Sequence, residues 1–303
     1  MTRGTTESAR TDPQLTAKLL TEVLPYIQRW RDKVVVIKFG GNAMIDDALA
    51  ATFASDMVLL RQVGILPVVV HGGGPQIGDM LRRLGKESVF EDGLRVTDAE
   101  TLDIARMVLV GKVNREIVGA INMHGPLAVG LSGQDAGIIT AKARDSRLGF
   151  VGDVSAVNST MIERMLAEGL IPVISTIGAD AAGQAYNINA DTVAGAIASS
   201  LGAEKIIYLT DVAGLLADVD NADTLISRIT SEALRASLDE GELVGGMIPK
   251  ITAAVEAVEH GVSSAHLLDG RVPHVMLIEL FTDSGIGTLI TKEPYTGSDG
   301  VES

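Results

Sequence analysis

A lysine at the end of an apolar run is the first residue of this chain that could do chemistry. Lys38 follows four apolar residues at 34–37, a pattern that predicts a strand buried on both faces, and Gly40 and Gly41 come soon after it. Burying an ammonium group in a sheet is costly unless an anion meets it. The segment therefore predicts a phosphate or carboxylate site at the end of this strand. The alternative is a lysine that extends its amine to solvent.

A second glycine-rich strand end lies further along the chain. The apolar run 66–70 is followed by His71, by three glycines at 72–74 and by Pro75, which suits the start of a helix. Three consecutive glycines leave backbone N–H groups open to an approaching anion, although a tight turn that needs positive φ would also explain them. Neither G-x-G-x-x-G nor G-x-x-x-x-G-K-[ST] is present, which disfavours nicotinamide oxidoreductases and P-loop proteins.

Two further segments place polar side chains at expected helix starts. Lys250 falls in the first turn of a helix expected to begin at Pro249, where the dipole opposes a cation by roughly 0.3–1 kcal/mol. A cation at the positive end of a helix dipole, next to a glycine-rich bend, favours a functional role for Lys250 over that of a solvent-exposed surface lysine. Asn189 is the expected N-cap of the helix that begins near 190. Capping accounts for Asn189 and the dipole for Asp191, but neither accounts for Asn187, which lies outside the helix.

The composition restricts the class of partner. The chain has 303 residues, a formal net charge of −14 and 3% aromatic residues, which argues against nucleic-acid and anionic-membrane partners. It contains no cysteine, and its five histidines lack metal-binding spacing, so we expect no metal site built by the protein. We recognise neither a signal peptide nor an apolar run of membrane-spanning length, and we expect a cytoplasmic protein.

Strand patterns alternate with helix patterns along the chain. This alternation predicts an α/β fold, namely a doubly wound, mostly parallel open sheet with helices on both faces. The expected strands cover 34–39, 66–70, 127–131, 171–175 and 205–210, and the expected helices begin near 48, 75, 99, 160 and 190. A capping box with Thr97 as the N-cap opens the third helix, which is expected to run to about 123. Residues 137–157 indicate hairpins on one edge of the sheet. Ligands in such sheets bind outside the carboxyl ends of the strands, where Lys38, the glycines at 72–74 and the pair Thr210 and Asp211 fall.

The first thirty residues are expected to form an element of their own. Asp12 and Pro13 signal a helix start, and an apolar side chain recurs every four residues from 15 to 27. Pro25 interrupts this pattern and predicts a kink or an early end. We therefore divide the chain into a tail and helix (1–30), an N-terminal lobe (31–204) and a C-terminal lobe (205–303).

Five segments together resemble the amino-acid kinase superfamily, and within it the kinases that act on N-acetyl-L-glutamate. They are 38–44, 71–75, 93–97, 186–191 and 245–250, and the similarity extends from about 24 to 290. Each segment is modestly specific, whereas their joint order and spacing are highly specific. The resemblance implies the two-lobed amino-acid kinase fold. It also implies phosphorylation of the side-chain carboxylate of N-acetyl-L-glutamate in arginine biosynthesis, by ATP that carries Mg²⁺ on its phosphates.

The resemblance implies a role for each matching residue. Lys38 and Lys250 would flank the transferring phosphoryl group, and Asp191 would orient both lysines. Arg95 would pair with the α-carboxylate of the substrate. Without the other matching segments, its sequence context would indicate only a surface arginine. The implied substrate-binding residues are Gly73, Gly74, Arg95 and Asn187, the last at the acetamido end of the substrate. The implied nucleotide-binding residues are Gly40, Gly41, Thr210 and Asp211.

Two more segments match the arginine-inhibited, hexameric branch of these kinases. One is the N-terminal helix, which in that branch joins dimers into a ring, and the other is the stretch 259–270 together with 279–288. The resemblance implies a homo-oligomer, a hexamer built as a trimer of dimers, in which L-arginine binds between this helix and the C-terminal lobe. His266 and Glu279 are the candidates for that pocket. Otherwise His266 is a strand-end residue and Glu279 a surface charge.

The chemistry of the residues agrees with a carboxylate acceptor. A carboxylate is ionised at neutral pH, so no general base is needed, and catalysis reduces to positioning and charge neutralisation. The competing interpretations are a sister kinase for aspartate, glutamate or carrier-linked aminoadipate, a catalytically silent arginine sensor, and a nucleotide-binding oxidoreductase. Gln134 stands where these kinases often carry a lysine, and 217–224 lacks the usual aromatic and proline residues, which leaves the nucleotide contacts open.

Overall fold

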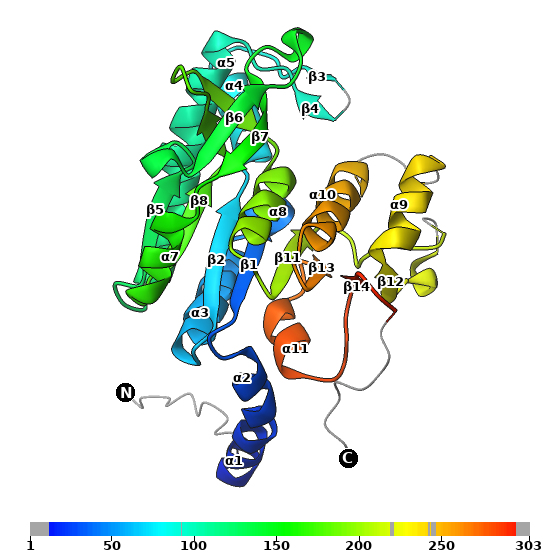
Figure 1. The fold of residues 1–303 in the computed structure, drawn as a ribbon. Coiled ribbons are helices and arrows are strands. Elements are labelled where there is room, and N and C mark those ends of the chain that lie inside the picture. The colour runs from blue at the N-terminus through cyan, green and yellow to red at the C-terminus, as the bar shows by residue number, and fades with distance from the viewer. Residues whose placement is uncertain (1–11, 92, 219–220, 242, 244–246, 295–303) are drawn as a thin grey trace, which may run out of the picture.

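The computed structural model describes residues 12–91, 93–218, 221–241, 243 and 247–294. Within these residues, the centre of the molecule is one eight-stranded sheet, parallel except where β13 meets β14 (Figure 1). Its order is β12 (Arg228–Thr230), β14 (Thr288–Thr291), β13 (Ser264–Asp269), β11 (Lys205–Thr210), β1 (Val34–Phe39), β2 (Leu66–His71), β8 (Ile171–Ser175) and β5 (Ala128–Ser132). The expected mostly parallel sheet is confirmed.

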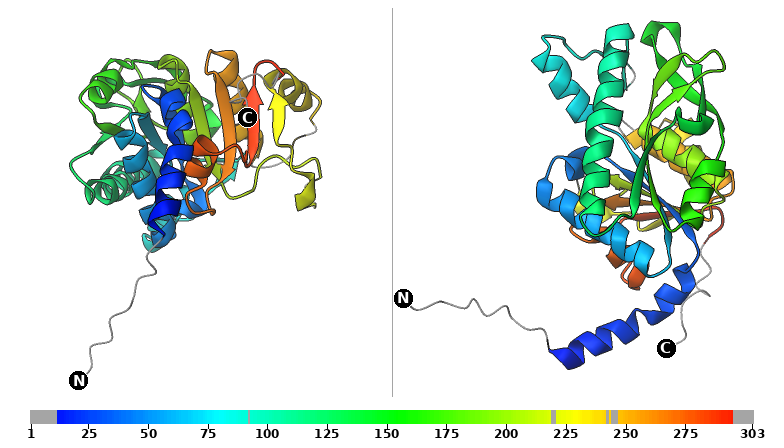
Figure 2. Two further views of the ribbon diagram at one scale, coloured as in Figure 1. Left: turned by 90° about the horizontal axis from the view of Figure 1, so that it is seen from below. Right: turned by 90° about the vertical axis from the view of Figure 1, so that its left-hand side faces the viewer.

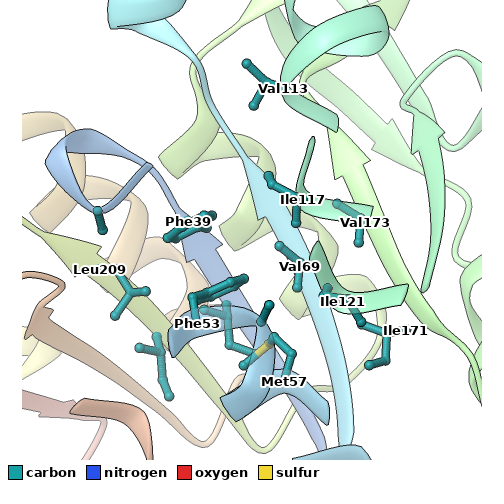
Figure 3. Close-up of a cluster of buried hydrophobic side chains, with 14 of the residues drawn as sticks. Phe39, Phe53, Met57, Val69, Val113, Ile117, Ile121, Ile171, Val173 and Leu209 are labelled. Atoms are coloured by element: carbon teal, nitrogen blue, oxygen red, sulfur yellow. The ribbon is translucent and has the colours of Figure 1, made fainter. Parts of the chain in front are cut away.

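Helices cover both faces of this sheet, which confirms the doubly wound arrangement. One face carries α3 (Asp47–Gln62), α6 (Asn114–Asn122) and α11 (Val275–Phe281). The other carries α7 (Thr160–Ala167), α8 (Ala190–Ser200), α9 (Ser231–Asp239) and α10 (Met247–Glu259). Phe39 of β1 stacks on Phe53 of α3 in the first core, with ring centroids 3.8 Å apart (Figure 3). Val36 points into the second core, and because side chains alternate along a strand, Lys38 shares that face.

A small closed barrel stands where hairpins on the sheet edge were expected. It consists of β6 (Ile139–Ala143), β7 (Val151–Val157), β9 (Ile177–Ala179) and β10 (Ala185–Ile188). The β6–β7 hairpin itself is present, but its predicted location is wrong. The reason is that β9 and β10, which come from outside 137–157, close this hairpin into a barrel instead of leaving it on the main sheet.

The helix expected over 99–123 is a continuous helical run with a π-helical middle. It comprises α5 (Ala99–Arg106), the π-helix η2 (Met107–Val113) and α6. Its N-cap is Asp98, which accepts a hydrogen bond from the Thr101 N–H at 2.8 Å, so the predicted cap at Thr97 is wrong. Thr97 is buried and donates to the Arg95 carbonyl at 2.8 Å instead.

The remaining elements are short. They are α4 (Gly74–Arg83), the hairpin strands β3 (Phe90–Glu91) and β4 (Leu94–Arg95), and the 3-10 helices η1 (Gly41–Met44), η3 (Asp135–Gly137), η4 (Ser146–Leu148) and η5 (Ala222–Thr224). The predicted start of α10 at Pro249 was wrong by two residues, because the helix begins at Met247. Lys250 nevertheless lies in its first turn. Gly245 and Gly246 fall outside the described residues.

The N-terminal segment forms two helices with the expected break between them. In α1 (Pro13–Glu22), the N-cap Asp12 accepts from the Gln14 N–H at 3.0 Å, and α2 (Leu24–Trp30) has Pro25 in its first turn. α1 projects away from the body of the molecule with its leucines exposed (Figure 2), whereas α2 packs against the core through Trp30. Across the described part of the chain, no helix is both long and apolar enough to span a membrane.

Candidate active site

Two lysines from different elements meet one buried carboxylate. Lys38 lies near the C-terminal end of β1 and Lys250 in the first turn of α10, and the Nζ atom of each is 3.1 Å from an oxygen of Asp191. Asp191 lies in the first turn of α8. The N-cap of that helix, Asn189, accepts from the N–H groups of Asp191 and Thr192, as its sequence position predicted.

These three side chains carry more positive than negative charge. Burial would raise the pKa of Asp191, but Lys38 and Lys250 together hold it below its ordinary value. Burial lowers the pKa of Lys250, and Lys38 adds to this effect while Asp191 opposes it. Two ammonium groups therefore share one carboxylate in a site of low solvent exposure. A surplus cation in such a site attracts an anion more strongly than it would in water.

Close packing at the glycine turn between β2 and α4 is confined to Gly73. None of the glycines at 72–74 has φ in the left-handed region, so a turn that requires that region is excluded; φ of Gly73 is 169°, which is extended. A Cβ on Gly73 would lie 2.6 Å from Cδ2 of Leu109 in the π-helix η2. A Cβ on Gly74 would meet no described atom within 4 Å. The turn is thus pressed closely against η2 at Gly73 and open at Gly74.

Arg95 reaches this turn from the β3–β4 hairpin. Its guanidinium donates to the Gly74 carbonyl at 2.9 Å and to the Ser88 hydroxyl, and it lies 4.6 Å from the centroid of the Phe90 ring. The residue is 9% exposed, so the interpretation as a surface arginine is wrong. Burial lowers the pKa of Arg95. Its polar side-chain partners among the described residues are neutral, which leaves the charge available for an anionic ligand.

Asn187 comes from β10 of the barrel and approaches the same place. Its Nδ2 donates to the Thr97 hydroxyl at 3.5 Å, and that hydroxyl donates in turn to the Arg95 carbonyl at 2.8 Å. The barrel and the β3–β4 hairpin are therefore joined behind the groups that face the cleft. This explains why Asn187, which a helix cap did not account for, lies in the site.

One cleft of about 210 Å³ brings most of the expected site residues together. Its lining includes Lys38, Gly40, Gly41, Gly73, Gly74, Arg95, Asn187 and Asp191. Lys250 adjoins the cleft through its contact with Asp191. A larger cavity of about 690 Å³ lies between α3 and α6, where Phe39, Phe53 and Val113 contribute to its wall, and none of the expected site residues lines it.

The residues expected to hold the nucleotide lie at one side of this cleft. Thr210 ends β11, and its hydroxyl donates to the Val212 carbonyl at 2.7 Å. Gly41 has φ +70°, and a Cβ there would lie 2.7 Å from a carboxylate oxygen of Asp211. Glycine is therefore needed at position 41 both for its backbone conformation and for the close approach of Asp211. Thr210 and Asp211 do not line the cleft itself.

The donor set of the cleft suits phosphate better than a metal ion. Among the described residues, no group of three or more His, Cys, Asp or Glu side chains could hold a metal. Asp191 is already occupied by two lysines. Lysines and backbone N–H groups bind phosphate oxygens, so Mg²⁺ fits here as an ion carried by a nucleotide.

His266 and Glu279 lie apart from this cleft, at the base of the sheet. The His266 Nδ1 is 2.8 Å from Glu279 Oε1, and the Lys205 Nζ is 2.6 Å from the same oxygen. All three side chains are buried, and the Lys205 amine also lies 5.5 Å from the centroid of the Trp30 ring in α2. The alternative interpretation of His266 as a strand-end residue and of Glu279 as a surface charge is therefore wrong. The three side chains form a buried polar cluster beside the N-terminal helices.

Lys205 was not predicted as a buried residue, although its position carries a signal. Lys205 opens an apolar strand just as Lys38 nearly closes one, and a lysine within such a run implies a buried partner. No role was predicted for Asn114, whose side chain is fully buried and bonds to His71. An isolated asparagine inside a helix carries no comparable signal.

Comparisons with known proteins agree with this geometry. The model of the amino acid kinase family matches residues 33–269. The acetylglutamate kinase of Acidothermus cellulolyticus is 54% identical over 288 residues, which cover 91% of this chain and 97% of the relative. That of Nostoc sp. is 51% identical over 280 residues, which cover 92% and 94%.

A solved structure extends the likeness to the fold in space. It is N-acetylglutamate synthase from Neisseria gonorrhoeae complexed with coenzyme A and N-acetylglutamate. The TM-score is 0.81 at 26% identity, and the match covers 92% of this chain and 64% of that one.

Proposed function

This chain belongs to the amino acid kinase family, and we propose that it transfers the γ-phosphoryl group of ATP to the side-chain carboxylate of N-acetyl-L-glutamate. The chain is a kinase. The proposal places it in arginine biosynthesis, where the product is N-acetyl-L-glutamyl 5-phosphate. The observation that carries the proposal is the pair of lysines that shares Asp191 at the edge of a glycine-lined cleft. It concentrates positive charge where two anions have to meet.

The side-chain carboxylate of the substrate is the nucleophile in this proposal. It is ionised at neutral pH, so its attack on the γ-phosphorus needs no general base. The barrier lies in bringing two anions together and in the charge that spreads over the phosphoryl oxygens. Lys38 and Lys250 neutralise that charge from two sides while Asp191 fixes their positions, and the N–H groups of Gly73 and Gly74 face the substrate.

Arg95 and Asn187 set the orientation of the substrate. Arg95 pairs with the α-carboxylate, which is supported by its burial without a described anionic partner. Asn187 contacts the acetamido end, which is supported by its place on the same cleft. Because one group binds each end, the side-chain carboxylate is left to point at the lysines.

The nucleotide lies at the side of the cleft lined by Gly40 and Gly41, and it extends beyond that side to Thr210 and Asp211. Mg²⁺ carried on the phosphates would supply further charge neutralisation. In this arrangement the segment 31–204 forms a lobe for the acylated amino acid, and 205–303 forms a lobe for ATP. The support is that the cleft opens at the carboxyl ends of β1 and β2, and that β11 is the strand paired with β1 on its other side. One sheet nevertheless crosses both segments through the β1–β11 pair.

A coupled assay of ADP formation with four acceptors tests the proposal. We expect turnover with N-acetyl-L-glutamate and at most a trace with L-glutamate, L-aspartate and L-2-aminoadipate. The free amines lack the acetamido group that Asn187 is proposed to contact, so their weak turnover would follow. Preferential turnover of any of the other three acceptors would overturn the substrate assignment while leaving the family intact.

We also propose that L-arginine inhibits the enzyme from the cluster of His266 and Glu279. Support comes from the position of this buried carboxylate beside α2, away from the cleft. Because Lys205 already occupies Glu279, an arginine guanidinium would have to displace its amine. The exposed leucines of α1 are proposed to join dimers into a hexamer, so that the helices transmit the effect.

Removing residues 1–30 tests this regulatory proposal. We expect a folded, active dimer with weakened arginine inhibition, because the linking helices are gone. Light scattering gives the mass, and an arginine titration of the initial rate gives the inhibition. A truncated protein that remains hexameric and equally sensitive to arginine would refute it.

A further inference from the structure

His71 is a fully buried histidine that the proposed reaction does not use. It ends β2 immediately before the glycine turn and has 0% exposure. Its Nδ1 lies 2.8 Å from the carbonyl oxygen of Gly72, and its Nε2 lies 3.0 Å from Nδ2 of Asn114. Both ring nitrogens are therefore engaged by neutral groups of the protein interior.

The proton of this ring can be placed from its neighbours. A carbonyl oxygen only accepts, and Nδ2 of Asn114 also lies 2.9 Å from the Val173 carbonyl, so the amide nitrogen of Asn114 faces both Val173 and His71. Asn114 then donates to Nε2 of His71, which leaves the proton on Nδ1, where it is donated to Gly72. Burial lowers the pKa of His71 to about 4, so this neutral form persists at physiological pH.

We infer that His71 is a positioning residue, which fixes the Gly72 carbonyl and thereby aims the N–H of Gly73 at the cleft. The Gly72 carbonyl and the Gly73 N–H belong to one trans peptide unit, in which they point in opposite directions. A bond that draws the carbonyl toward the ring therefore turns the N–H away from it. Among the described residues, the Gly73 N–H has no acceptor in the protein, as a group reserved for a ligand should. That this ligand is the acylated amino acid rests on the proposed function.

The glycines make such a device necessary. Because Gly72 and Gly73 have no side chains, the peptide between them can rotate at little cost. A ligand that must fix such a flexible backbone loses affinity to the entropy of ordering it. His71 holds the turn from one side, while Leu109 of the π-helix η2 presses on Gly73 from the other. Asn114 directly follows η2, so one π-helical segment supports both contacts. Asn114 bonds to Nε2 of the histidine, and the bond from Nδ1–H of His71 to Gly72 is the one that holds the turn.

Two substitutions of His71 separate its two hydrogen bonds. In His71→Asn, the side-chain amide nitrogen stands at the position of Nδ1 and can still donate to Gly72. In His71→Gln, the amide stands at the position of Nε2, so contact with Asn114 is kept while the bond to Gly72 is lost. Asn114→Leu is the matched control. It removes the buried hydrogen bonds of the asparagine but leaves the Nδ1–H of His71 directed at Gly72.

Steady-state kinetics and thermal unfolding of the full chain give the test. We expect His71→Gln to raise the KM for N-acetyl-L-glutamate at least ten-fold and the KM for ATP less than two-fold. His71→Asn and Asn114→Leu should keep the first KM within three-fold of wild type, even where their Tm falls. A purely structural histidine would lower Tm in all three variants without this split. Equal KM values for His71→Gln and His71→Asn would overturn the inference.

A second arm does not depend on the substrate. Crystal structures should show the Gly72–Gly73 peptide rotated in His71→Gln and unchanged in His71→Asn. An inactive wild-type enzyme would count against the proposed function alone, whereas an unrotated peptide in His71→Gln would count against the role of His71 alone. Should His71→Gln fail to fold, the other two variants still decide, because a ten-fold rise of this KM in either contradicts the proposed geometry.

Discussion

Lys38 and Lys205 lie on neighbouring strands of one sheet, yet their surroundings differ in charge. Lys38 shares Asp191 with a second lysine, whereas Lys205 meets Glu279 at 2.6 Å with a histidine, His266, as the other partner of that carboxylate. Lys38 also borders a cleft, while the amine of Lys205 is enclosed. Two buried lysines can thus have different purposes. Lys38 belongs to a site with excess positive charge beside a cavity, which can bind an anion. Lys205 is neutralised by a carboxylate and, within the described part of the chain, borders no such cavity, so it links the strand to the helix that carries Glu279.

The histidines of the two centres differ in the same way. His71 has only neutral polar partners, Gly72 and Asn114, and its low pKa keeps it a fixed hydrogen-bond bridge. Burial also lowers the pKa of His266, but Glu279 opposes this effect and Lys205 adds to it. His266 is therefore part of a charged cluster that a ligand could rearrange. His71 instead bonds directly to neutral groups, and the nearest charge in its network is Arg115, which donates to Asn114.

The largest expected effect is on turnover at the cleft. Lys38→Met removes the charge at nearly constant volume, and Lys250 alone is then left to face the phosphoryl group. We expect kcat to fall by about 10³-fold, because the lost interaction is strongest in the transition state. Initial rates at saturating substrates measure this. Lys205→Met is the control, since its folded enzyme should turn over at nearly the wild-type rate. Near-normal turnover of Lys38→Met would remove Lys38 from the catalytic set.

The next effect is on stability at the other lysine. Lys205→Met leaves the carboxylate of Glu279 buried with His266 as its remaining partner. We expect the free energy of unfolding to fall by about 3–5 kcal/mol, the usual result of removing one member of a buried ion pair. Chemical denaturation measures it. Lys33→Met breaks an exposed pair with Glu204 and should cost less than about 1 kcal/mol. Equal losses of unfolding free energy in Lys205→Met and Lys33→Met would show that the pair of Lys205 with Glu279 does not stabilise the fold more than an exposed pair does.

A smaller effect is expected from pH. An unfolded histidine binds a proton below pH 6.5, whereas native His71 binds one only near pH 4. The unfolded state therefore binds more protons between these values, and stability falls as the pH falls from about 6.5 to 4, by at most on the order of 3 kcal/mol. Denaturation curves for wild type and His71→Asn across this range give the difference. A wild-type slope that persists in His71→Asn would assign it to other groups.

The contrast between the two centres also shows how far sequence reaches. Lys38 and Lys250 could be found because each breaks a local rule, such as a charge in an apolar strand or a cation at a helix start. Asp191 breaks no such rule, and its role was implied only by the family resemblance. The parallel sheet followed from alternation alone. Lys205 broke the same rule but was missed, because its partners Glu279 and His266 come from distant elements that no local pattern connects. The barrel was missed for the same reason, since it is closed by strands outside the hairpin.

The glycine turn shows a different limit of sequence reasoning. Its glycines were predicted to expose backbone N–H groups to an anion, with a turn of positive φ as the alternative. The structure adds a cause that neither interpretation named, namely the close approach of Leu109, in a π-helical segment, to Gly73. A π-helix leaves no clear sequence signal, and its side chains are displaced from the helix register that periodicity assumes. The residue was therefore identified correctly while its physical cause was not.

Gly73→Ala gives the next smaller effect in the cleft. The new Cβ would lie 2.6 Å from Leu109 Cδ2, so we expect a loss of about 1–3 kcal/mol in stability through overpacking. Denaturation of the variant measures this loss. The double variant Gly73→Ala with Leu109→Ala removes the obstructing atoms, so its loss should be smaller than the sum of the two single losses. Strict additivity would show that Leu109 does not press on the turn.

The smallest effect is expected at Gly74, and it separates packing from ligand approach. A Cβ at this position meets no described atom within 4 Å, and alanine suits the first turn of α4, so stability should stay equal or rise by about 0.4–1 kcal/mol. The same methyl group stands beside the cleft, where the backbone is proposed to meet the substrate. We expect the KM for N-acetyl-L-glutamate to rise about ten-fold, or about 1.4 kcal/mol, while the KM for ATP stays unchanged. A variant with unchanged kinetics would show that the substrate approaches Gly73 and Lys38 without contacting Gly74.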